Sequence, residues 1–93
     1  MLVFPDQSLA WDVSALADLT LESLSLVIDA SDEIDILIIG CGAAFCDEPA
    51  GLRRGLRNHG IVLEWMDTGA ACRTFNVLLA EDRRLAAALI ATQ

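Results

Sequence analysis

The residues best equipped for chemistry lie where an apolar run ends in Asp67-Thr68-Gly69 and passes into a helical pattern. Over the next two turns this pattern adds the thiol of Cys72, the guanidinium of Arg73 and the amide of Asn76. A carboxylate, a thiol and a guanidinium at one helix start could bind an anion or metabolite, or support an enzymatic reaction. A second group of small residues, Gly40-Cys41-Gly42, follows another apolar run.

Both groups are expected at the carboxyl end of a strand. Ligands of open parallel sheets collect beyond these ends, because loops and helix amino termini with unpaired amides converge there. If the two strands are neighbours, the two groups share one rim of the molecule. The candidate ligand-binding residues are therefore Gly40, Cys41, Gly42, Asp67, Thr68, Cys72, Arg73 and Asn76.

Each candidate also has a purely structural explanation. The glycines let the chain leave the sheet without a Cβ clash, and Asp67 or Thr68 can cap the helix that follows. Arg73 faces the positive end of the helix dipole, so we favour an ion pair with Asp67 over an anion site. Cys72 is either a reactive thiol at the helix start or a small residue at the border of the core.

No motif identifies a reaction. Gly40-Cys41-Gly42 supplies G-x-G, but Phe45 stands where the third glycine of a dinucleotide fingerprint belongs, and no G-K-[ST] follows. The three cysteines form no C-x-x-C pair, and the single histidine, His59, is expected at the opposite end of the sheet. We therefore expect no cofactor and no metal, and we favour a non-catalytic role over an enzymatic one.

Alternating strand and helix patterns must position the two groups. The expected strands are 1–4, 34–39, 61–66 and 85–90, and the expected helices are 21–30, 48–59 and 69–81. The near-continuous apolarity of residues 34–39 is typical of a central parallel strand covered on both faces. For residues 85–90 the alanines favour helix, whereas the short apolar run favours a buried strand; we take the strand. The order predicts an α/β fold with a parallel βαβαβ core.

Residue types at the ends of these elements set their limits. Pro5-Asp6 ends the first strand in a turn, and Thr20 can cap the first helix. Asp47 and Pro49 suit the start of the second helix, and Gly60 suits its left-handed end.

The second and third helices are expected to be amphipathic. On the second helix Leu52 and Leu56 lie on the apolar face, whereas Arg53, Arg54 and Arg57 point to water. On the third helix the core face consists of Ala71, Phe75, Leu78 and Leu79.

Composition narrows the class of protein. The chain has 93 residues, 55% of them apolar, so we expect a single domain over residues 1–93. A net charge of −8 opposes binding to nucleic acid or anionic lipid. All six arginines follow residue 52, and this asymmetry either steers a basic partner to the acidic first half or only aids solubility. The odd number of cysteines and the short apolar runs predict a cytoplasmic protein with no membrane span.

Two segments, DILIIGCGA and GIVLEWMDTGAACRTFNVLLAEDRRLAAALI, resemble a widespread family of small domains of unknown function. This family includes the mitochondrial respiratory complex I assembly factor 3 and the adipogenesis-associated domain protein. The resemblance covers roughly residues 1–91 and is most specific from Met66 to Glu81. The residues that match its bacterial form are Gly40, Gly42, Asp67, Thr68, Ala71, Cys72, Thr74, Asn76 and Glu81.

The resemblance implies a three-layer fold with a mixed sheet, no established catalytic residues, and a protein-interaction role similar to that of an assembly factor. A small-ligand or enzymatic site at the strand ends is the alternative. Family members usually have further residues before the strand at 1–4, so we expect either that this sequence begins late or that the amino-terminal β-hairpin of the family is missing. Apolar surface left bare in this way would favour a homodimer.

Overall fold

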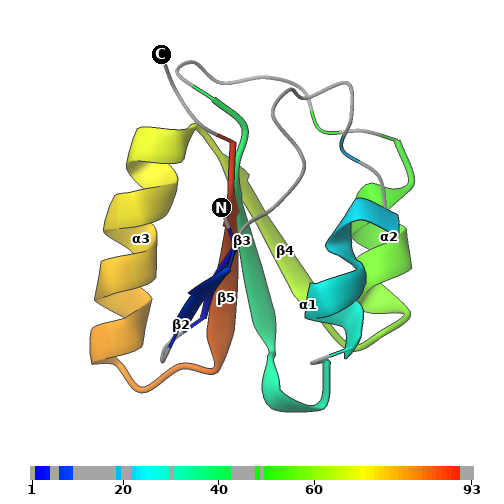
Figure 1. Ribbon diagram of the computed structural model, residues 1–93, viewed down its shortest axis with the longest axis horizontal. Helices are drawn as coiled ribbons and strands as arrows, with labels where there is room; N and C mark the ends of the chain where they lie inside the picture. Colours follow the sequence, from blue (N-terminus) through cyan, green and yellow to red (C-terminus); the bar gives the residue numbers. More distant parts are fainter. Residues whose placement is uncertain are drawn as a thin grey trace.

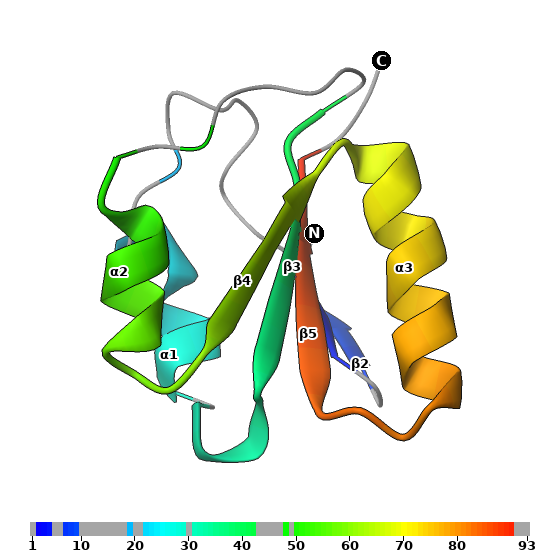
Figure 2. The ribbon, with the colours of Figure 1, turned by 180° about the vertical axis from the view of Figure 1, so that it is seen from behind.

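A five-stranded mixed sheet lies between two helical layers in the computed structural model (Figure 1 and Figure 2). The structure describes residues 2–4, 7–9, 19, 22–29, 31–42, 48 and 50–90. The long helix α3 (Thr68–Ala80) covers one face of the sheet, and α1 (Ser25–Asp29) and α2 (Leu52–Arg57) lie on the other face. This arrangement confirms the predicted three-layer α/β architecture.

The sheet has the strand order β2-β1-β5-β3-β4. Its strands are β1 (Leu2–Phe4), β2 (Gln7–Leu9), β3 (Ile36–Gly40), β4 (Val62–Met66) and β5 (Leu85–Leu89). Strand β3 runs parallel to β4 and β5, whereas β1 runs antiparallel to both β2 and β5. Two short 3-10 turns flank α1, namely η2 (Glu22–Leu24) and η3 (Ser31–Glu33).

The elements from β3 to β5 form the predicted parallel βαβαβ core. Strand β3 lies between β4 and β5 and all five of its residues are buried, as expected for a strand covered on both faces. Strand β5 confirms the strand prediction for the alanine-rich segment. Its pairing with β1 and β3 outweighs the helix propensity of three consecutive alanines.

Alternate residues of the strands bury against different helices. On the face of α1 and α2, Leu37 and Ile39 of β3 belong to the same core as Leu52 and Leu56 of α2. The core on the α3 face contains Ile36, Ile38, Ala71, Phe75, Leu85 and Ala87, with Leu78 and Leu79 packed against it. Each fully buried Leu or Ile contributes about 1.5–3 kcal/mol of transfer free energy. The predicted apolar faces of both helices are thereby confirmed.

Helix α2 is shorter than the predicted helix over residues 48–59. It begins at Leu52, because Gly51 before it has a φ of 82°, a left-handed conformation that a helix cannot continue through. Asp47 and Pro49 lie outside the described residues. Helix α2 ends at Arg57 and not at residue 59, but the predicted left-handed closing role of Gly60 is confirmed: Gly60 has a φ of 78°, its N–H donates to the Arg57 carbonyl at 2.9 Å, and the Ile61 N–H donates to the Leu56 carbonyl at 3.0 Å.

The amino-terminal third differs from the prediction in two places. The helix expected over residues 21–30 consists of the turn η2 followed by the five residues of α1. Thr20, its expected cap, lies outside the described residues, as do Pro5 and Asp6. Strand β2 was not predicted, because three residues give no readable alternation; its pairing with β1 brings Leu9 opposite Leu2.

Candidate functional site

The two groups of small residues meet at one rim, as predicted. They are joined by backbone hydrogen bonds from the Cys41 N–H to the Met66 carbonyl (2.8 Å) and from the Thr68 N–H to the Gly42 carbonyl (2.9 Å). The Gly42 N–H donates in return to Thr68 Oγ1 at 3.0 Å. Parallel register explains this meeting, because Gly40 and Met66 are partners at the ends of β3 and β4.

The Thr68 hydroxyl ties a third strand into the same rim. While Oγ1 accepts from Gly42, the hydroxyl donates to the Ile90 carbonyl at 2.8 Å, just beyond the end of β5. The Ile90 N–H donates to the Gly40 carbonyl at 2.9 Å. The ends of all three parallel strands are therefore closed onto the first turn of α3, and these polar groups bind one another.

Gly40 is required by the close approach of α3. A Cβ at this position would lie 2.8 Å from the Thr68 Cα, a separation that real Cβ atoms essentially never show, and a tight 3.1 Å from the Ala71 Cβ. A Cβ at Gly42 would meet open space, but Gly42 has a φ of 124°, which residues with a side chain rarely adopt. The close approach of α3 and the backbone conformation thus explain why these two positions are glycine. Cys41 between them is buried, with 4% of its surface exposed.

Asp67 caps α3. Its side chain accepts a hydrogen bond from the Ala70 N–H at 2.8 Å, and its extended backbone is that of an N-cap residue. The ion pair that we expected between Asp67 and Arg73 is absent: among the described residues, ion pairs join Glu48 to Arg53 and Asp35 to Arg84. The Asp67 carboxylate is used for capping, and the Arg73 side chain is exposed.

Cys72 and Asn76 take no part in the hydrogen bonds given above for the rim. They line a hollow of about 220 Å³ between α3 and the sheet, together with Val3, Phe75, Ala87 and Leu89. Most of this lining is apolar, and the Cys72 side chain is exposed at it. The structure therefore brings five of the eight candidates together at the rim, places Cys72 and Asn76 at the hollow, and leaves Arg73 exposed on α3. Their ligand-binding role stays a prediction.

The described residues assemble no complete catalytic set. His59 is exposed and precedes β4, whereas the rim lies at the far end of that strand, as expected from the sequence. No group of three or more His, Cys, Asp or Glu side chains in the described part of the chain could hold a metal ion. The rim can stabilise the fold through its hydrogen bonds, and its polar groups are already committed to that task.

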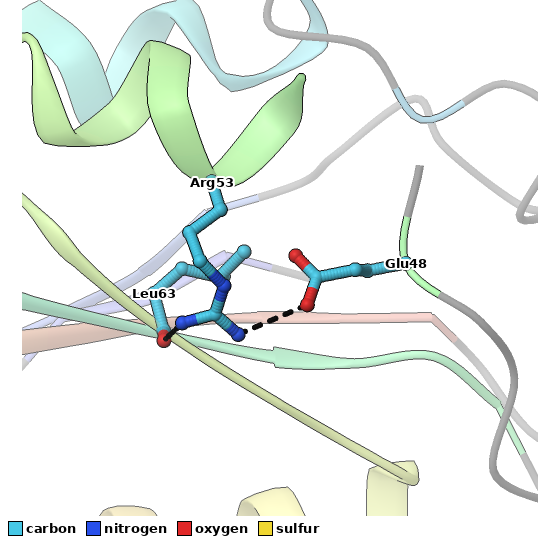
Figure 3. Close-up of polar contacts among 3 residues, drawn as sticks. All are labelled: Glu48, Arg53 and Leu63. Carbon is cyan, nitrogen blue, oxygen red and sulfur yellow. Dashed lines mark hydrogen bonds and ion pairs between the residues drawn. The ribbon is translucent and has the colours of Figure 1, made fainter. Parts of the chain in front are cut away.

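The sequence did not predict the contacts of Arg53. Figure 3 shows its guanidinium between the Glu48 carboxylate and the backbone of β4. Nη1 donates to the Leu63 carbonyl at 2.8 Å, and Nη2 lies 3.0 Å from Glu48 Oε1. The three arginines of α2 are exposed as expected, but Arg53 is held in place. The five-residue spacing from Glu48 to Arg53 was the available signal, and it is not a regular helical spacing.

Fold and site define a small three-layer α/β domain whose parallel strand ends are closed by the hydrogen bonds of one threonine. The chain belongs to the family described as proteins of unknown function DUF498/DUF598, whose profile matches residues 1–90. This confirms the family resemblance that the sequence motifs indicated.

The chain is 41% identical to the Xenopus tropicalis NADH dehydrogenase [ubiquinone] 1 alpha subcomplex assembly factor 3, covering 98% of this chain and 50% of that protein. It spans about half the length of the curated assembly factors that it matches. A Bartonella henselae structure titled as an outer membrane protein has a TM-score of 0.89 at 41% identity, covering 99% of this chain and 77% of that chain. A Rhodopseudomonas palustris structure has a TM-score of 0.88 at 42% identity, with shares of 99% and 67%.

None of the helices in the described residues has the length and apolar character needed to cross a bilayer.

Proposed function

We propose that this domain is a non-catalytic protein-interaction module that acts in the manner of an assembly factor. The observation that carries the proposal is the closed rim, where the Thr68 hydroxyl binds both Gly42 and Ile90. Since the strand ends, the usual ligand position of such sheets, are committed to internal hydrogen bonds, the outer surfaces are left for function.

The names of the relatives also support an assembly-factor role. Several are named as assembly factors of NADH dehydrogenase, and this chain matches one of them over 98% of its own length. We propose that the partner is a subunit of a respiratory NADH dehydrogenase or a protein that handles such a subunit. Action in the cytoplasm, as the sequence predicts, is part of this proposal.

Affinity capture tests the proposal. The tagged chain is expressed in the cells it comes from and recovered at physiological salt, and bound proteins are identified by mass spectrometry. We expect the same NADH dehydrogenase subunit, or a protein bound to it, in every replicate. Recovery of no reproducible partner would count strongly against an interaction module. A second copy of the chain is a separate outcome, which sedimentation at several concentrations would reveal as a dimer.

The alternative is a small-ligand role at the hollow beside Cys72. Its mostly apolar lining would suit part of an apolar metabolite, with the Asn76 amide as a polar contact. The volume of about 220 Å³ is below the range of about 300–1,000 Å³ that is typical of ligand sites. We therefore rank this role second.

A further inference from the structure

Three arginines form one exposed face of α2, which we call the arginine face: Arg53, Arg54 and Arg57. At about 100° per residue they fall within roughly 100° of arc, away from the buried Leu52 and Leu56. Together with Gly51 they line an open hollow of about 430 Å³. This is the larger of the two hollows described here, and its side chains are cationic.

The arginine face is a local exception on an acidic protein. The whole chain carries a net charge of −8, yet α2 itself contains no acid. Among the described residues, Arg53 has an ion-pair partner, while Arg54 and Arg57 have none. Two guanidinium groups therefore present their donors to solvent beside a third that is fixed in place.

Arg53 shows how a carboxylate is bound on this face. Its Nη1 is fixed by the Leu63 carbonyl of β4, an edge strand of the sheet, and this contact points Nη2 toward Glu48 (Figure 3). The Glu48 carboxylate thus binds Arg53 as an external carboxylate would bind another arginine of this face. A guanidinium presents donors in a fixed fork that suits carboxylates, and holding Arg53 in advance reduces the entropy lost on binding.

We propose that the arginine face binds an acidic segment of the partner protein, with Asp or Glu carboxylates seated on Arg54 and Arg57. This inference rests on the proposed interaction function and names the chemistry of the partner. A short acidic segment would contact only the arginine face. An extended nucleic acid would also lie against the rest of the surface, and a chain with a net charge of −8 would repel it. The described residues that line the hollow also include no aromatic side chain on which a base could stack.

A labelled hexaglutamate peptide, followed by fluorescence anisotropy, tests the proposal at low and at physiological salt. We expect Arg54→Gln/Arg57→Gln to weaken binding about ten-fold, since an exposed ion pair changes affinity by up to about five-fold. The matched control is Arg73→Gln/Arg83→Gln, which removes the same charge from exposed sites on α3 and the following turn. Circular dichroism checks that both variants fold.

Glu48→Gln supplies a test in the opposite direction. Removing the carboxylate that competes for Arg53 is expected to tighten peptide binding about two- to five-fold. A loss of binding that is equal in the two double variants would overturn the proposal, because it would mean non-specific attraction to positive charge. Tighter binding of an oligonucleotide than of the peptide would also overturn it.

Affinity capture from the native extract distinguishes failure of this inference from failure of the proposed interaction function. If Arg54→Gln/Arg57→Gln loses a partner that the wild type and the control variant retain, the inference is supported. If both double variants retain the partner, the arginine face is not the docking site, but the interaction function stands. If the wild type itself recovers no partner, the function fails.

Discussion

Thr68 and Gly42 exchange two hydrogen bonds across the rim: the Gly42 N–H donates to Thr68 Oγ1 at 3.0 Å, and the Thr68 N–H donates to the Gly42 carbonyl at 2.9 Å. This exchange joins residues 26 positions apart in the chain. It fixes the loop after β3 against the start of α3. The rim is therefore a closure of the fold, and its polar residues hold the strand ends together.

Removing the Thr68 hydroxyl should destabilise the protein. Thr68→Val keeps a similar shape but leaves the Gly42 N–H and the Ile90 carbonyl without that partner. Leaving partly buried groups unsatisfied costs about 1–3 kcal/mol in the free energy of unfolding. Urea titration measures this loss. Thr74→Val, on the same helix, is the control and should change the free energy of unfolding less. Equal losses would mean that the hydrogen bonds of the Thr68 hydroxyl do not stabilise the fold specifically.

Gly40 and Gly69 should respond oppositely to a methyl group. Gly40→Ala would press its Cβ against the Thr68 Cα at 2.8 Å, and such overpacking costs about 1–3 kcal/mol. At Gly69, in the first turn of α3, the nearest atoms lie at 3.4 and 3.6 Å, so Gly69→Ala should leave stability unchanged or raise it by up to about 1 kcal/mol. Thermal unfolding compares the two. A stable Gly40→Ala variant would contradict the packing described here.

The two described cysteines should differ in their accessibility to an alkylating reagent. Cys72 is exposed beside the hollow, whereas Cys41 is buried behind the rim. We expect Cys72 to be labelled at once and Cys41 only as the protein unfolds, as followed by mass spectrometry of digested samples. Labelling of Cys72 that is faster than that of a free thiol peptide would favour the small-ligand alternative. Equal, slow labelling of both would remove its best support.

The pair formed by Arg84 and Asp35 should give no pH dependence of stability from neutral to mildly alkaline pH. A side-chain hydrogen bond to Asp35 raises the pKa of Arg84 above its ordinary value. A raised pKa means that the stabilisation is present below the unfolded pKa and is lost only as the pH rises through the folded one, far into alkali. Arg84→Gln should therefore lower stability slightly and equally from neutral to mildly alkaline pH. A difference that grows over this range would contradict the assignment.

Local residue patterns predicted most of the fold. The apolar run before Gly40 and the helix that follows Asp67 were identified to within about two residues, because burial on both faces and N-capping leave clear signals. The start of α2 was missed, since the left-handed conformation of Gly51 overrode the apparent cap at Asp47. Strand β2 is too short to show a period of two and depends on its pairing with β1.

The site was predicted less completely than the fold. The positions of Gly42 and Thr68 after two predicted strands correctly indicated that they lie at one rim. These positions could not show that the two residues hydrogen-bond to each other. The expected Asp67–Arg73 pair was wrong: the Asp67 carboxylate caps α3 instead, and residue spacing alone does not decide between capping and an ion pair. The contact of Arg53 with Leu63 joins a side chain to a backbone group ten residues away, and no side-chain pattern encodes such a contact.

We propose that the domain acts by binding a protein partner during assembly of a larger complex. The most direct measurement deletes the gene for the chain in its own cells and quantifies intact NADH dehydrogenase by native gel electrophoresis and activity staining. We predict a loss of the assembled enzyme that the wild-type gene restores. Full assembly and activity in the deletion strain would contradict the account.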